Sequence, residues 1–235
     1  MRRAKSGAAH VVDRPPIHRR QTGCLHPAHA PSGWWRVLRR WLRISLALTG
    51  RLTRLRERLT GERLAREEDP SLLWAAVAAV LTPDLDSILL IRRAERSGDP
   101  WSGHMALPGG RHESGDEDLL ATVIREAREE VGISLSRGSL AGNLDDVVPR
   151  IPILPPIAVR PFVFVPSTRP ALLPNPEVAS ARWVPLDELL KPGIRRLVRL
   201  DLQGEPRDVQ AYQLEDALVW GMTERILTSL LRHLV

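Results

Sequence analysis

Three glutamates at helical spacing constrain this chain more than any other feature of its sequence. Glu126, Glu129 and Glu130 follow a glycine-rich stretch, at relative positions zero, three and four. In an α-helix this spacing places the three carboxylates on one face, about a turn apart. Because like charges on one face repel one another, the pattern favours a binding site for a divalent cation. The alternative is a solvated helix face that Arg125 and Arg128 compensate.

Residues 117–131 are predicted to form the helix that carries these glutamates. Ser114 and Glu117 have the spacing of a capping box, and Asp116 is a competing N-cap residue. Gly132 suits a left-handed C-cap. The glutamates are expected on a polar side of the helix, opposite a buried stripe formed by Leu120, Val123 or Ile124, Ala127 and Val131.

The stretch as a whole resembles the signature of the Nudix hydrolases, G-x5-E-x7-R-E-U-x-E-E-x-G-U with U aliphatic. The spacing agrees from Glu117 through Arg125 to Gly132. One extra residue stands between Gly110 and Glu117, as it does in the coenzyme A diphosphatase branch of that family. The resemblance implies an α/β fold with a mixed β-sheet, an α/β/α sandwich in which the signature forms a loop–helix–loop.

Flanking segments extend the resemblance over residues 71–235. Strands are predicted at 74–81, 87–93 and 157–165, and Trp220 begins a segment similar to the Trp-Gly-Leu-Thr that opens the closing helix of coenzyme A-type members. Two positions depart from that branch: Asp99 and Trp101 stand where it places an arginine and a histidine.

The resemblance also implies which residues form the site. Arg125 is expected to orient a glutamate, and Glu117 to have a structural or metal-organising role. Glu126 could act as the base that orients water, and Glu177, in a late loop, is the other candidate for a base or a further ligand. The expected ligands of Mg²⁺ or Mn²⁺ are Glu126, Glu129, Glu130 and the main-chain carbonyl of Gly110.

Several further polar residues are weaker candidates. Arg92 and Arg93, with Arg160, are expected to meet substrate phosphates, although arginine is common throughout this chain. Asp145 and Asp146 are alternative acids from a proline-punctuated loop. His104 and His112 match no zinc-binding pattern and are interpreted as surface residues.

The reaction implied is metal-dependent hydrolysis of a diphosphate bond in a nucleoside diphosphate derivative. Coenzyme A or an acyl-CoA is the leading substrate, cut to phosphopantetheine and adenosine 3′,5′-diphosphate. ADP-ribose or another dinucleotide is the alternative substrate. A non-catalytic nucleotide-binding module is the alternative in a different class of function.

The charge of the chain divides it in two. Residues 1–70 hold sixteen Lys/Arg against six Asp/Glu, whereas the remainder is mildly acidic, so a basic extension is predicted before a domain at 71–235. Residues 1–33 are expected to be disordered, and a basic amphipathic helix is predicted from Trp34 to about residue 66. This helix could pack on the body or a partner subunit, contact anionic lipid, or serve in organelle targeting.

Cysteine content bears on the compartment. The single cysteine, Cys24, excludes an internal disulfide and indicates a reducing compartment, so a cytoplasmic location is expected. Organelle targeting or peripheral membrane association through the basic extension is the alternative. The expected partners are a small nucleotide substrate and, as an option, a second copy of the chain in a homodimer. No specific nucleic-acid partner is expected.

Overall fold

The computed structural model describes residues 50–59, 68–98, 101–149, 157–202 and 204–234. All of these belong to one compact unit, Arg43–Val235. The expectations for residues 1–49, which include disorder, membrane contact and targeting, lie outside the described residues, as does Asp99. In the part of the chain that is described, no helix is both long and apolar enough to cross a membrane.

Strands make up most of the unit, and two long helices cover them. In chain order the elements are β1 (Leu73–Val80), β2 (Ser87–Arg93), β3 (Met105–Ala106), β4 (Gly109–Arg111), α2 (Leu119–Val131), a 3₁₀ turn η2 (Arg137–Ser139), β5 (Leu140–Asn143), β6 (Ile157–Phe164), β7 (Val178–Pro185), α3 (Leu186–Leu189), β8 (Arg195–Leu202), β9 (Glu205–Gln213), β10 (Leu218–Trp220) and α4 (Gly221–Leu234). The predicted strands at 74–81, 87–93 and 157–165 agree with β1, β2 and β6.

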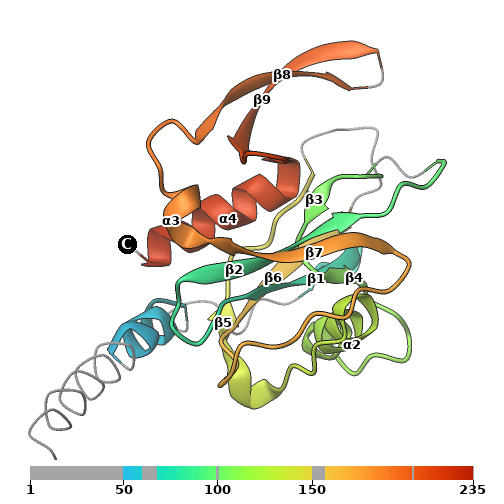
Figure 1. Cartoon of the computed structure of the whole chain (residues 1–235). Helices are drawn as coiled ribbons and strands as arrows, with labels where there is room; N and C mark the ends of the chain where they lie inside the picture. The colour runs from blue at the N-terminus through green and yellow to red at the C-terminus, as the bar shows by residue number, and fades with distance from the viewer. Residues whose placement is uncertain (1–49, 60–67, 99–100, 150–156, 203, 235) are drawn as a thin grey trace, which may run out of the picture. The chain divides into compact units, whose positions relative to one another are not determined.

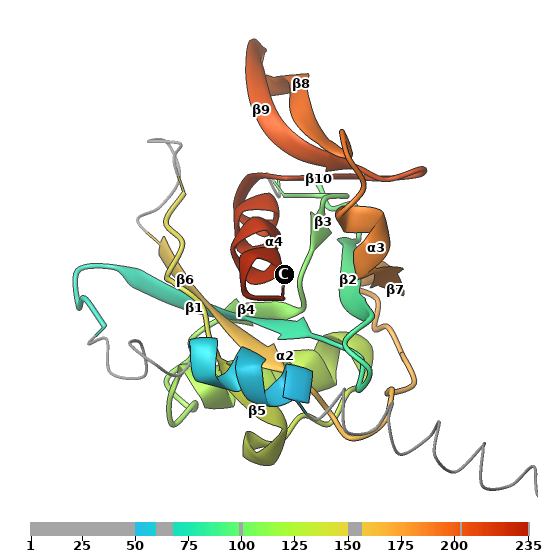
Figure 2. The same ribbon diagram turned by 90° about the vertical axis from the view of Figure 1, so that its left-hand side faces the viewer.

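The strands form three sheets with the orders β4-β1-β6-β5, β3-β2-β7 and β10-β9-β8. In the first sheet β1 runs parallel to β6 and antiparallel to β4, so this sheet is mixed as predicted. An isolated bridge between Leu81 and Ile88 joins β1 to β2 beside their turn. β8 and β9 form a long antiparallel ribbon that extends away from α4 in both views (Figure 1 and Figure 2).

The helices α2 and α4 lie on opposite sides of the sheets, and each packs into its own hydrophobic core. Alternate residues of β2 enter different cores, because successive side chains of a strand point to opposite faces. Leu89 and Ile91 pack with α2, whereas Ile88 and Leu90 pack with α4. Figure 1 shows the strands between these helices. The predicted α/β/α sandwich is therefore confirmed.

Helix α2 begins two residues later than predicted. Its N-cap is Asp118, whose side chain accepts a hydrogen bond from the Ala121 amide, so neither Ser114 nor Asp116 caps it. The predicted C-cap agrees, because Gly132 has a φ of 71°, which a residue without a Cβ adopts easily. One expectation for the polar side was wrong: Glu130 is buried, with 5% of its surface exposed.

Residues 50–59 are helical and belong to the packed body. Leu55 and Leu59 are almost fully buried in the core on the α4 side. Gly142 allows this close approach, since a Cβ there would lie 2.5 Å from the Leu59 Cβ. One alternative for the predicted helix was that it packs on the body, and residues 50–59 do so. The domain boundary near residue 70 stays a prediction.

Candidate active site

Two consecutive glycines bring the backbone of β4 against its neighbours. A Cβ on Gly109 would overlap the Ala76 carbonyl and lie 2.6 Å from the Val77 Cα, and the φ of 151° disfavours other residues. A Cβ on Gly110 would instead overlap the carboxylate of Glu126. The first glycine therefore lets β4 dock on β1, and the second leaves space for an acid.

Glu130 is a buried acid beside these glycines. Its Oε2 accepts a hydrogen bond from the Gly109 amide at 2.8 Å. Burial raises the pKa of Glu130 to about 7, and the charges of Glu126 and Glu177 also raise it, against the lowering effects of the Gly109 amide and the Arg93 charge. Near neutral pH this carboxyl is therefore poised between its protonated and ionised forms.

Glu126 lies one turn before Glu130 on the same face of α2. Its side chain is 15% exposed, and its Oε1 accepts a hydrogen bond from Arg125 Nη1 at 2.9 Å. Burial raises the pKa of Glu126 even though Arg125 lowers it. Both acids thus carry negative charge that their surroundings do not fully stabilise, which is the electrostatic condition that favours a bound cation.

Arg125 is held by a group of carboxylates and does not point into open solvent. Its strongest partner is Asp116, with Nε–Oδ1 and Nη2–Oδ2 distances of 2.9 and 3.0 Å. These contacts raise the pKa of Arg125 and lower that of Asp116. Because Asp116 fixes the guanidinium, the bond from Arg125 can orient Glu126, which is the role the sequence predicted for this arginine.

The third glutamate of the signature faces differently. Glu129 is 55% exposed and accepts a bond from Arg125 Nη1 at 3.2 Å. Among the described residues, no three acidic, histidine or cysteine side chains converge as a group of metal ligands. Glu126 and Glu130 still offer carboxylate oxygens beside the glycines of β4. Oxygen ligands of this kind suit a hard cation such as Mg²⁺.

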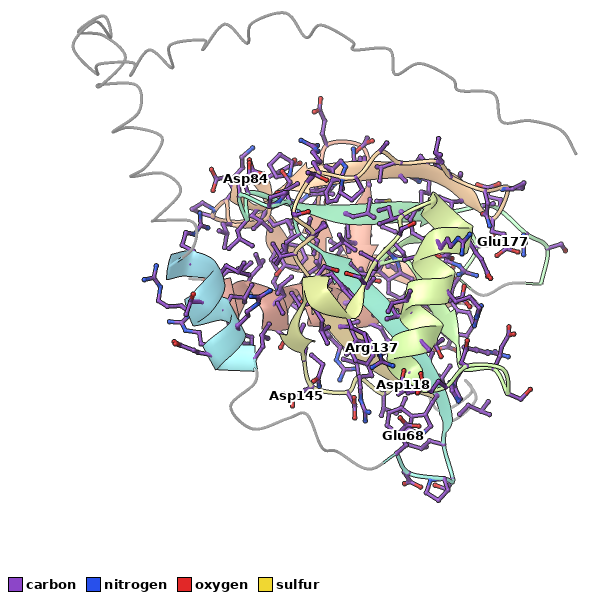
Figure 3. All side chains as sticks on the ribbon, turned by 90° about the horizontal axis from the view of Figure 1, so that it is seen from below. Glu68, Asp84, Asp118, Arg137, Asp145 and Glu177 are labelled. Atoms are coloured by element: carbon purple, nitrogen blue, oxygen red, sulfur yellow. The ribbon has the colours of Figure 1, made fainter. Side chains whose placement is uncertain are left out.

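Glu177 approaches this site from the loop before β7, beside α2 (Figure 3). Its Oε1 lies 2.9 Å from Arg96 Nη2, and both side chains are about half exposed. The loop that carries Glu177 is joined to α2, because the Asn175 amide donates to the Glu130 carbonyl at 2.9 Å. The charge of Glu177 raises the pKa of Glu130. Glu117, in contrast, is 85% exposed and lies 3.5 Å from Arg137 Nη2, away from these acids.

The two arginines predicted to bind substrate are separated. Arg93 lies near Glu130, whose pKa its charge lowers. Arg92 is directed away, where its Nη2 donates to the Asp216 carbonyl at 3.0 Å. The separation follows from the alternation of side chains along β2. The sequence predicted the same substrate-binding role for both arginines because they are adjacent. In the folded strand their side chains lie in two different environments.

The remaining candidates have other contacts. Arg160 Nε lies 2.9 Å from Asp146 Oδ1 and its guanidinium packs over the Trp74 ring, so it fastens the loop after β5. His112 Nδ1 lies 2.9 Å from the Thr122 hydroxyl. His104 makes an edge contact with the Trp220 ring. None of these contacts reaches Glu126 or Glu130.

Comparison with known proteins assigns the family. A family model described as NUDIX domain matches residues 72–200, which is more than half of the chain. The chain belongs to the Nudix family. It is 32% identical to a Nudix hydrolase NudL of Citrobacter koseri over 79% of this chain and 94% of that protein. These similarities show that the protein is a hydrolase of the Nudix family.

Two other proteins resemble parts of this Nudix hydrolase. An uncharacterized protein of Schizosaccharomyces pombe is 40% identical over 48% of the chain, and the match covers only 36% of that relative's length. The crystal structure of a MutT/nudix family protein from Enterococcus faecalis is 21% identical over 73% of this chain and 65% of that chain, with a TM-score of 0.48.

Two contacts of this Nudix site were not foreseen in the sequence. Asp116 was interpreted only as a cap, because its nine-residue separation from Arg125 crosses a turn that periodicity does not describe. Arg96 was not singled out, because its partner Glu177 lies 81 residues further along the chain. For Asp116, the available signal was an acidic side chain in the loop shortly before α2.

Proposed function

We propose that this Nudix hydrolase cleaves the diphosphate bond of coenzyme A or an acyl-CoA, with Mg²⁺ or Mn²⁺ as its cofactor. The observation that carries the proposal is the pair Glu126 and Glu130, two partly or fully buried acids with raised pKa values beside Gly109 and Gly110. Two such acids, when ionised, lower the stability of the fold. A divalent ion bound between them and a diphosphate would stabilise their charges.

The chain's own residues have distinct roles in this proposal. Asp116 fixes Arg125, and Arg125 orients Glu126. Glu177 would act as the base towards water, from the loop whose Asn175 amide donates to the Glu130 carbonyl. The ion would be held by Glu126, Glu129, Glu130 and the Gly110 carbonyl, and when bound it would neutralise diphosphate charge and lower the pKa of a water.

Support for coenzyme A comes from the loop between β4 and α2. The loop between Gly110 and Glu117, which is one residue longer than the family pattern, contains a turn in which the Asp116 amide donates to the Glu113 carbonyl at 3.0 Å. Asp116, which pairs with Arg125, belongs to this longer loop, so the loop contributes a residue to the site. ADP-ribose or another dinucleotide is the alternative substrate, because it presents the same adenosine diphosphate group.

A metal-dependent hydrolysis screen tests the proposal. The substrates are coenzyme A, acyl-CoAs, ADP-ribose, NADH, diadenosine polyphosphates and nucleoside triphosphates, with EDTA and Mg²⁺ re-addition as arms. Glu129→Gln and Glu130→Gln should each lower kcat by at least about a hundredfold, since each removes a charged ligand. Glu205→Gln, an exposed change on β9, is the matched control.

The outcomes separate the alternatives. Cleavage of coenzyme A in preference to ADP-ribose supports the proposed substrate, and the reverse preference replaces it with the alternative. Unchanged turnover in both glutamine variants would overturn the assignment of the site. Nucleotide-dependent stabilisation without any metal-dependent product would favour a non-catalytic binding module.

A further inference from the structure

The ion pair of Arg96 and Glu177 joins two segments at the edge of the site. Arg96 follows β2, and Glu177 precedes β7. The backbones of the two segments are also connected, because the Ala94 amide donates to the Glu177 carbonyl at 2.8 Å. The side-chain contact is therefore held by a fixed main-chain frame, although both side chains are half exposed.

The same loop is fastened to α2. The Asn175 amide donates to the Glu130 carbonyl at 2.9 Å, and the Glu177 amide donates to Asn175 Oδ1 at 2.8 Å. Figure 3 shows Glu177 beside α2, at the end of that helix away from Asp118. Arg96 is thus brought close to the acids that the diphosphate would approach.

Stability does not account for the pair. An exposed ion pair contributes little to stability, because solvent screens it and both side chains lose freedom. Arg199 and Asp208 make a comparable exposed pair on the β8–β9 ribbon. A guanidinium fits phosphate oxygens as well as it fits a carboxylate. Exchange of Glu177 for a phosphate therefore has a small cost at Arg96.

We propose that Arg96 is a phosphate-binding residue of this site, and that Glu177 holds its guanidinium before substrate binds. The inference rests on the proposed diphosphate hydrolysis. On binding, a phosphate oxygen replaces the Glu177 carboxylate at Arg96. The released carboxylate is then free to face Glu130 and the attacking water. Arg96 therefore couples arrival of the substrate to the placement of Glu177.

The test measures binding of adenosine 5′-diphosphate with Mg²⁺ by calorimetry, since both candidate substrates contain this group. Arg96→Ala should weaken binding roughly tenfold, the size expected for a charged hydrogen bond. Glu177→Gln should tighten binding severalfold, because Arg96 no longer has to leave a carboxylate. Arg199→Ala, from the comparable pair on the ribbon, should bind as the wild type does.

The double variant Arg96→Ala/Glu177→Gln decides between exchange and simple charge repulsion. Exchange predicts that Glu177→Gln has no effect once Arg96 is absent. Repulsion predicts the same tightening in either background, and that result would overturn the proposal, as would unchanged binding in Arg96→Ala. All variants should unfold at the wild-type temperature, because the pair is exposed.

These measurements do not depend on the hydrolytic substrate. If coenzyme A and every other compound of the screen resist cleavage but the binding pattern holds, the proposed function fails and the Arg96 site stands. If hydrolysis is confirmed and Arg96→Ala changes neither binding nor KM, the Arg96 site fails and the function stands.

Discussion

The acids at the two ends of α2 have pKa values shifted in opposite directions. At the start of the helix, Asp116 pairs with Arg125, Asp118 pairs with Arg137, and both acids have lowered pKa values. In the second half, Glu126 and Glu130 have raised pKa values, with burial as the first cause. At one end of this short segment arginines stabilise the ionised acids, whereas at the other end burial destabilises the ionised form.

This difference separates structural acids from functional ones. An acid whose ionised form is stabilised by the fold contributes to stability, whereas an acid whose ionised form is penalised lowers it. The cost at Glu126 and Glu130 is what a bound cation would remove. Charge alone does not distinguish the two ends, because both are rich in carboxylates.

Asp116→Asn is expected to have the largest effect on stability. It removes a 6% exposed carboxylate from Arg125 and should lower the free energy of unfolding by about 3 kcal/mol at pH 7, measured by urea titration. The lowered pKa means that this contribution is present above the ordinary aspartate pKa and is lost as the pH falls, so the difference from the wild type should narrow in acid. Glu113→Gln, which touches the same guanidinium from an exposed position, should cost less than about 0.5 kcal/mol.

Glu130→Gln is expected to change stability in the opposite direction. The folded-state pKa of about 7 lies above the unfolded value, so wild-type stability should fall as the pH rises from about 5 to about 8. In EDTA at pH 8 the variant should be more stable by about 2 kcal/mol, and its stability should change little over this interval. Urea titrations at both pH values measure the slopes. Equal slopes in the two proteins would mean that the ends of α2 do not differ as described.

Asp118→Ala should have a smaller effect than the changes at Asp116 and Glu130, a loss of about 1 kcal/mol from the missing N-cap. Thermal unfolding measures it, and hydrolysis should be unchanged because Asp118 lies at the compensated end. Arg137→Ala removes the exposed ion pair and leaves the cap, so it should cost less than Asp118→Ala. If the two variants cost the same, the ion pair and not the cap would be the source of stability.

Much of the fold could be predicted because it depends on neighbouring residues. Short apolar runs located β1, β2 and β6, and Gly132 marked the end of α2. Where the prediction was wrong, a longer-range contact decided the outcome. Glu130 follows the polar spacing of its helix, yet it is buried because the Gly109–Gly110 backbone and the loop before β7 cover it. The ribbon of β8 and β9 was not foreseen, because most of its residues are exposed and only the end of β9 enters a core.

By itself, the sequence determined the family, the helix and the set of acids, because these follow from residue types at fixed local spacing. The tertiary structure decided which acids are compensated. It placed Asp116 on Arg125, Glu177 on Arg96, and Arg92 and Arg93 in separate environments. Burial and ion pairing depend on segments that are distant in the chain, so the electrostatic difference between the two ends of α2 arises only when the chain is folded.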